Sequence, residues 1–494
     1  MRNLIQKRGT LLLFVIVSFI LILPPIIHQY PYPNFSDDTP CFLQVVEKVA
    51  DGDLTQQDTY IFFEQHSLGG FGSGYYRYAA PATVGLVARA LDSDPYWTFY
   101  AFHYLSLILI AFCLYLFCSR VFNKTAGILS LFLVLLSTPS FLRFFLFGSV
   151  FNLVNLLVFG LMGSLALIYF IKTKRIYYAI CSLALFGISV LYHSSTGIEI
   201  FASVGFFLVC YLAYKAFKRH WQDFKSVGVY SVVFCALNGL LLYFLAPESK
   251  ILVTSALNIS NETSISSLAV TQSPFTLTGF IIADTSFVLL VLGAMATVYL
   301  FKKRKNLSQV NQLGIWLTSA FVLVIGTTMM MGSNEPSRSG QDMSIYLAIV
   351  LTGFVSIALY NLKHKIRARK DKIVGVILIA CMTIPCMMGW FAYDSAIHPV
   401  DKEAIAFINS TNGSYSISTQ IQYRIYTLFI DNEFLKEGGD YIIYRNQAMT
   451  AERRIGELYC MVQGNESTES DYDGLEIVAE FNEDDLEIII YRND

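Results

Sequence analysis

Two adjacent carboxylates, Asp37 and Asp38, follow the first long apolar segment of the sequence, residues 10–27. If that segment crosses a bilayer, both acids lie at the water-facing surface where the chain leaves the membrane. Such a pair could take a proton from a hydroxyl group or hold a divalent cation such as Mg²⁺ or Mn²⁺. Carboxylates are also favoured at helix N-termini, so the spacing alone leaves a capping role open.

Apolar residues recur at helical spacing directly after the acid pair, at Phe42, Val45, Val46 and Val49. This pattern predicts a short amphipathic helix that lies along the membrane surface. Gly52 is expected to end it.

Two further ionisable residues lie at predicted membrane crossings. His193 ends the apolar segment 176–193, where its ring could bind a substrate or be satisfied by a neighbouring carbonyl group. Glu199 lies just inside the next segment, 197–217. A carboxylate inside a crossing is costly, so it is expected to face a cavity or a partner group.

The elements that must position these residues are membrane helices. The chain of 494 residues is 54% hydrophobic and only 15% charged, whereas soluble domains average roughly 25% charged residues. A net charge of −2 argues against a nucleic-acid partner. Eleven apolar runs are long enough to span a bilayer, at residues 10–27, 99–119, 125–142, 150–171, 176–193, 197–217, 227–246, 285–301, 313–331, 344–361 and 373–393.

The basic residues predict the orientation. With the N-terminus in the cytoplasm, the inner loops hold 22 Lys and Arg residues and the outer loops hold six. This bias agrees with the positive-inside rule. Because the number of crossings is odd, the C-terminal segment is expected outside. We therefore expect an integral membrane protein, with the plasma membrane as its location.

Residues 394–494 form the one clear compositional boundary, with 20 acidic and seven basic residues. We expect two parts: a membrane domain over 1–393, whose first outer loop is 28–98, and a small extracytoplasmic α/β domain. The expected elements of the second part are a helix over 401–409 and strands over 440–445, 475–481 and 486–492.

The first outer loop resembles that of the GT-C superfamily of polytopic glycosyltransferases, especially the aminoarabinose-transferase and protein-mannosyltransferase branch (family 39-like). That branch has an Asp-Glu pair after its first crossing, then an amphipathic helix and a Gly-Asp turn. Here Asp37 and Asp38 stand at the acid pair, and Gly52-Asp53-Leu54 stands at the turn. The likeness covers about residues 10–220.

A tyrosine and a proline follow in the family, and this chain has Tyr78 and Pro81. The sequence departs from the branch at Ala79 and Ala80, where the family carries an acidic and a basic residue. It also has no Trp-Trp-Asp-Tyr-Gly motif, unlike the catalytic subunits of oligosaccharyltransferases.

The resemblance implies transfer of a sugar from a polyprenyl-phosphate donor to an envelope lipid, glycan or protein, with inversion at the sugar. It implies Asp37 as the base, and Asp38 as a group that orients the acceptor or binds a metal ion. Arg338 resembles an arginine that many family members carry before a late helix, and it would contact the phosphate. The other expected substrate-binding residues are Arg77, Tyr78, His193 and Glu199.

Two alternatives remain open from the sequence. A transporter or flippase for a lipid-linked sugar would move its substrate without forming a glycosidic bond. A non-enzymatic envelope receptor or assembly protein would depend on residues 394–494 and not on Asp37.

Overall fold

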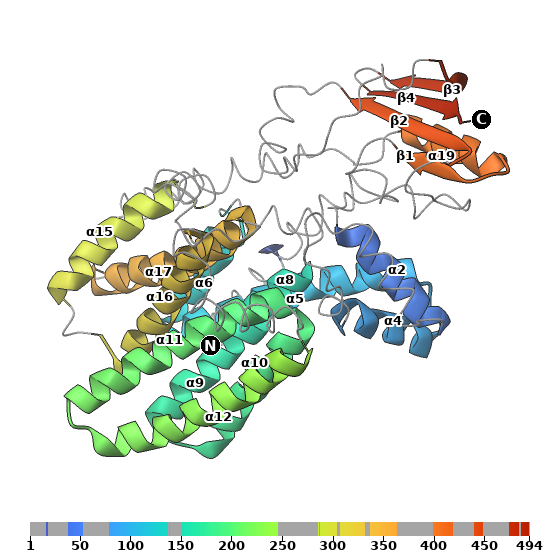
Figure 1. Cartoon of the computed structure of the whole chain (residues 1–494). Coiled ribbons are helices and arrows are strands. Elements are labelled where there is room, and N and C mark those ends of the chain that lie inside the picture. The colour runs from blue at the N-terminus through green and yellow to red at the C-terminus, as the bar shows by residue number, and fades with distance from the viewer. Residues whose placement is uncertain are drawn as a thin grey trace, which may run out of the picture.

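The computed structural model describes residues 16–17, 38–52, 79–136, 138, 150–245, 285, 287–303, 307–330, 336–362, 399–417, 439–447, 474–483 and 486–493. They form a bundle of long helices, a pair of shorter helices beside it, and a small sheet with one helix (Figure 1). The predicted crossings over 10–27 and 373–393 lie almost entirely outside the described residues.

The bundle forms from apolar runs without interior proline, which satisfy their backbone hydrogen bonds within each helix. Its helices are α5 (Pro95–Val121), α6 (Lys124–Leu133), α8 (Val150–Val154), the π-helix η2 (Asn155–Gly160), α9 (Leu161–Thr173), α10 (Ile176–Tyr192), α11 (Ser194–Phe217), α12 (Trp221–Leu245), α15 (Phe287–Lys303), α16 (Gln309–Met330) and α17 (Pro336–Leu362). Within the described residues, six helices are long and apolar enough to cross a membrane. The chain is therefore an integral membrane protein, and the count of eleven crossings stays a prediction.

Two helix ends differ from the ends of the predicted apolar runs. In the run over 125–142, helix α6 ends at Leu133, and the Thr138 hydroxyl beyond it donates to the Leu133 carbonyl over 3.0 Å. Helix α17 begins at Pro336, upstream of the run over 344–361, and its apolar span, Asp342–Leu362, agrees with that run. Proline is well suited to a first helical turn, where its missing N–H needs no partner.

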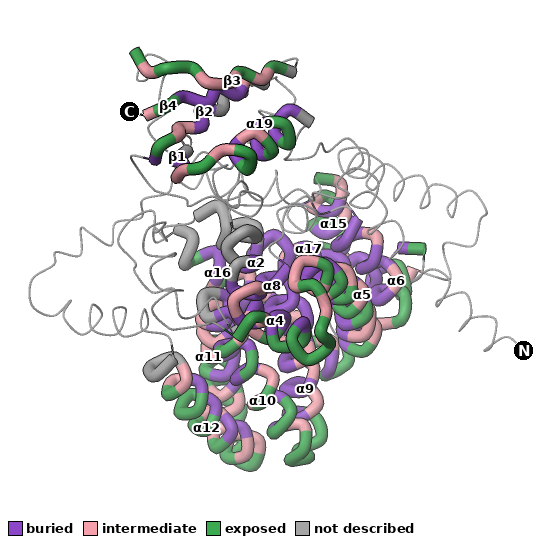
Figure 2. The backbone as a smooth tube through the Cα atoms, turned by 90° about the vertical axis from the view of Figure 1, so that its right-hand side faces the viewer, coloured by how far each residue is buried: buried purple, intermediate pink, exposed green. Residues whose placement is uncertain are grey.

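The interior of the bundle is built from buried apolar side chains, and the outward turns of its peripheral helices are exposed (Figure 2). Of the apolar span in α17, 78% of residues are buried, against 22% in α12. Val229 and Val232 of α12 are among the large apolar side chains that stay exposed. An apolar surface of this extent suits contact with lipid rather than water. Helix α17 is thus central, and α12 is peripheral.

The amphipathic helix predicted after the acid pair forms as α2 (Asp38–Asp51), and its position along the membrane surface stays a prediction. It ends before Gly52, which has a φ of 77°. Helix α2 packs against α4 (Ala79–Leu91) and α5. The contact with α4 is closest at Gly85, where a Cβ atom would lie 2.6 Å from the Val46 carbonyl oxygen. Only glycine allows the two helices this approach.

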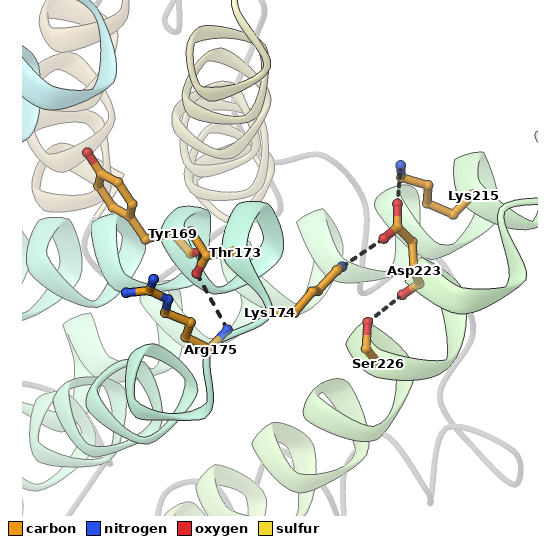
Figure 3. A network of polar contacts seen from close by, with 7 residues as sticks. All are labelled: Tyr169, Thr173, Lys174, Arg175, Lys215, Asp223 and Ser226. Atoms are coloured by element: carbon orange, nitrogen blue, oxygen red, sulfur yellow. Dashed lines mark hydrogen bonds and ion pairs between the residues drawn. The ribbon is translucent and has the colours of Figure 1, made fainter.

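At the opposite end of the bundle, Asp223 joins three helices (Figure 3). Its carboxylate lies 3.0 Å from Nζ of Lys174, which follows α9, and 2.7 Å from Nζ of Lys215 on α11. The two ion pairs hold the ends of α9 and α11 against the start of α12.

The C-terminal part forms a four-stranded sheet in the order β1-β2-β4-β3, with one helix against it. Its elements are α19 (Pro399–Ser410), β1 (Tyr415–Ile417), β2 (Tyr441–Gln447), β3 (Glu476–Glu483) and β4 (Leu486–Arg492). The predicted helix and the three predicted strands are confirmed, and β3 pairs antiparallel with β4. Strand β1 was not predicted, and it pairs parallel to β2. The domain boundary near residue 394 stays a prediction.

Candidate functional site

Five polar side chains are buried where α8, η2, α10, α11 and α17 meet. They are Asn152, Asn155, His193, Asp342 and Tyr346, with exposed fractions between 0% and 3%. We call this group the polar cluster. Buried polar groups are costly unless they are hydrogen-bonded, and ionisable ones inside a membrane usually serve a function. The polar cluster is therefore the candidate site.

One contact of the cluster links α8 to α17. The Asn152 side-chain amide donates a hydrogen bond to the Asp342 carboxylate over 3.0 Å. The two residues are far apart in the sequence, so only the packing of α8 beside α17 brings them together. The predicted run began at residue 344, after Asp342. Because α17 begins at Pro336, Asp342 instead lies within the helix.

A second contact links η2 to the junction between α10 and α11. The Asn155 side-chain amide donates to the His193 backbone carbonyl over 2.9 Å. The His193 ring Nδ1 lies 2.6 Å from the Thr196 hydroxyl, within hydrogen-bonding distance. Both the carbonyl and one ring nitrogen of His193 thus take part in holding the junction.

A third contact involves the π-helix. The Tyr346 hydroxyl of α17 donates to the Leu156 carbonyl over 3.0 Å. A Cβ atom at Gly160 would lie 2.7 Å from that hydroxyl, so the glycine leaves room for the tyrosine. π-Helical turns widen the backbone and are frequent at functional sites.

Glu199 lies half-buried near the start of α11. A Cβ atom at Gly160 would lie 2.7 Å from the Tyr346 hydroxyl and 3.3 Å from Cδ1 of Ile200, the residue that follows Glu199. The structure therefore brings Glu199 and His193, which the sequence singled out, to the same place as Asp342.

Helix α2 follows the acid pair in the sequence and contacts α8, which carries Asn152 of the polar cluster. Helix α2 begins at Asp38, and Phe42 lies one turn later. The Phe42 ring meets the Phe151 ring edge-on, with centroids 5.0 Å apart. Because Phe151 precedes Asn152 on α8, the start of α2 lies beside the polar cluster.

Helix α17 carries two residues of the polar cluster, Asp342 and Tyr346. Arg338 lies in its first turn, four residues before Asp342 and hence on the same face. The remaining predicted residues, Asp37, Arg77 and Tyr78, lie outside the described residues.

Sequence reasoning missed Asn152, Asn155, Asp342 and Tyr346. A signal was present in the four-residue spacing of Arg338 and Asp342, and in two asparagines within an apolar run. For the expected divalent cation, the described part of the chain gathers no three His, Cys, Asp or Glu side chains as ligands.

A separate acidic group lies where α2 meets the start of α5. Burial, with smaller effects from Asp51 and Asp94, raises the pKa of the Glu47 carboxyl from 4.5 to about 7. Asp94 itself caps α5 by accepting a hydrogen bond from the Trp97 backbone N–H over 3.0 Å. Glu47 is therefore protonated over part of the neutral range, which reduces repulsion at this contact.

No protein-family model matches the chain, and no curated protein matches it in sequence. Solved structures do resemble it. The Archaeoglobus fulgidus oligosaccharyltransferase in complex with Zn and sulfate aligns with a TM-score of 0.56 and 10% identity, over 87% of this chain and 67% of that one.

Two other transferases are similar in structure. ArnT from Cupriavidus metallidurans bound to undecaprenyl phosphate aligns with a TM-score of 0.53 and 11% identity, over 98% of both chains. The mycobacterial arabinofuranosyltransferase AftD aligns with a TM-score of 0.50 and 11% identity, over 99% of this chain and 40% of that one. The chain therefore has the GT-C glycosyltransferase fold that the sequence resemblance predicted.

Proposed function

We propose that the chain is a membrane glycosyltransferase that moves a sugar from a polyprenyl-phosphate donor to an envelope lipid, glycan or protein. The observation that carries the proposal is the GT-C fold, shared with ArnT over 98% of both chains. The contact of Phe42 on α2 with Phe151, next to Asn152 on α8, supports it, because α2 follows directly after the acid pair in the sequence.

In the proposed reaction, the Asp37 carboxylate takes the proton of an acceptor hydroxyl while the hydroxyl oxygen attacks the anomeric carbon. A new C–O bond forms, and the bond from the sugar to the lipid phosphate breaks on the opposite face. The bonding electrons leave with the phosphate, whose charge the Arg338 guanidinium would balance. Inversion needs only one base, so no nucleophilic carboxylate is required.

The remaining predicted residues would hold the substrates. Asp38 would orient the acceptor hydroxyl or bind a divalent cation. His193 and Glu199, at the start of α11, would line the donor site. Arg77 and Tyr78, just before α4, would contact the donor from the first outer loop.

The donor class is supported by the ligand of the similar ArnT structure, undecaprenyl phosphate. We further propose that the protein lies in the plasma membrane, with a cytoplasmic N-terminus and an extracytoplasmic C-terminal domain. Its other contacts would be with membrane lipid.

The test is mass spectrometry of envelope glycans and lipids from cells that lack the protein. The cells would be complemented with the wild type or with Asp37→Asn at equal membrane expression. We expect the wild type alone to restore a missing sugar, whose mass would identify its class. Full restoration by Asp37→Asn would refute the catalytic assignment and favour a transporter or a receptor.

A further inference from the structure

Two polar contacts join α17 to the segment formed by α8 and η2, and they are one helical turn apart on both sides. Asn152 bonds to Asp342, and the Leu156 carbonyl accepts the Tyr346 hydroxyl, each over 3.0 Å. The four-residue step from 152 to 156 matches the step from 342 to 346. The two contacts therefore fix the register of α17 along α8.

One more four-residue step from Asp342 toward the start of α17 reaches residue 338. On α17 that residue is Arg338, in the first turn. On the other side, α8 begins only at Val150. Arg338 thus lies one turn before Asp342, on a part of α17 that precedes the level at which α8 begins.

From this arrangement, we infer that Asn152 and Asp342 are positioning residues that hold Arg338 at the phosphate of the lipid donor. The inference rests on the proposed role of Arg338. The Asn152–Asp342 hydrogen bond pins the first turns of α17 against α8. Among the described residues, the next hydrogen bond from α17 to this segment is at Tyr346, a further turn away. Loss of the Asn152–Asp342 bond would therefore loosen the turn that carries Arg338.

Burial strengthens the Asn152–Asp342 hydrogen bond. Both side chains are 1% exposed, so water does not compete for the donor and acceptor. Hydrogen bonds between membrane helices contribute measurably to their association. Removing one partner alone would leave a buried polar group unsatisfied, whereas replacing both by apolar groups of similar size costs less stability.

The test measures binding of undecaprenyl phosphate to the full-length protein in detergent, with thermal unfolding as the check on folding. The variant Asn152→Leu/Asp342→Leu removes the bond, and the exchange Asn152→Asp/Asp342→Asn restores it with reversed polarity. Asp342→Asn keeps the bond but removes the charge. The matched control is Asn238→Leu, because the buried Asn238 side chain bonds only within its own helix in the described contacts, to the Phe234 carbonyl over 3.0 Å.

We expect the double leucine variant to bind about tenfold more weakly, as expected for loss of one such bond. Asn238→Leu should bind as the wild type does, and the exchange variant and Asp342→Asn should each bind more tightly than the double leucine variant. In an Arg338→Ala background, the double leucine change should cause no further loss. A purely structural role would not produce this dependence on Arg338.

Three results would overturn the inference while the proposed function stands: unchanged binding by the double leucine variant, or binding as weak as that of the double leucine variant by the folded exchange variant or by Asp342→Asn. The last would mean that the Asp342 charge acts directly. If the wild type and Arg338→Ala bind equally, Arg338 does not hold the phosphate, and its proposed role and the inference fail together.

Discussion

The rings of Phe42 and Phe151 meet edge-on, with centroids 5.0 Å apart and planes at 87°. Phe42 belongs to helix α2, which begins at Asp38, and Phe151 belongs to the membrane helix that carries Asn152. This contact joins α2, which follows the acid pair in the sequence, to α8, which carries one residue of the polar cluster. Changes that move α2 should therefore affect activity without touching a catalytic group.

Gly85→Ala tests that relationship. The added Cβ would lie 2.6 Å from the Val46 carbonyl oxygen, so α2 and α4 must separate. Overpacking of this kind costs about 1–3 kcal/mol of folding free energy. We expect a lower unfolding temperature and a loss of transferase activity. Gly205→Ala is the matched control, because a Cβ atom there meets nothing within 4 Å. Equal behaviour of the two variants would show that the α2–α4 contact does not matter.

Asp37→Asn and Asp38→Asn separate the roles of the two acids. Loss of a general base typically lowers the rate about 10²–10⁴-fold. We expect Asp37→Asn to lower kcat by that amount with little change in donor KM. Asp38→Asn should mainly raise the KM for the acceptor. The check is steady-state kinetics with purified protein, and a larger kcat loss for Asp38→Asn would reverse the assignment.

Glu47 predicts a pH dependence of stability. Its pKa is about 7 in the folded protein against an ordinary 4.5, so the folded state binds more protons there between these values. The free energy of unfolding should therefore fall as pH rises from 4.5 to 7, and the Glu47 contribution should be constant above that range. Glu47→Gln should reduce this slope, measured by thermal unfolding from pH 5 to pH 8. The exposed Glu403, on α19, provides the control Glu403→Gln. An unchanged slope in Glu47→Gln would contradict the prediction.

Asp223→Asn should change stability but not activity. It removes the ion pairs to Lys174 and Lys215 (Figure 3). Lys215 lies in the last turn of α11, whereas His193 of the polar cluster lies at its start. Partly exposed pairs contribute up to about 1 kcal/mol each, so we expect a modest fall in unfolding temperature. Transferase activity at 25 °C should equal that of the wild type. A large activity loss in folded protein would mean that this end of the bundle is coupled to the site.

The sequence by itself determined the local elements. Long apolar runs cannot stay in water and must form helices in the membrane, so the crossings could be recognised without a partner element. The spacing of Phe42, Val45, Val46 and Val49 likewise determined α2, and β-branched residues determined β2 and β4. These are short-range properties of the chain. The ends of helices were harder to predict from the sequence. Helix α6 ends before Thr138, whose hydroxyl donates to the Leu133 carbonyl, and α17 begins at Pro336, before its apolar run.

The tertiary structure alone decided which polar residues meet. Asn152 and Asn155 look in the sequence like isolated polar residues in an apolar run, and nothing local links them to His193, Asp342 or Tyr346. Their contacts depend on which helices are neighbours, on the register of α17 along α8, and on the π-helical turn that brings the Leu156 carbonyl to Tyr346. Periodicity shows which face of a helix is apolar, but a hydrogen bond between two helices requires both to be in place.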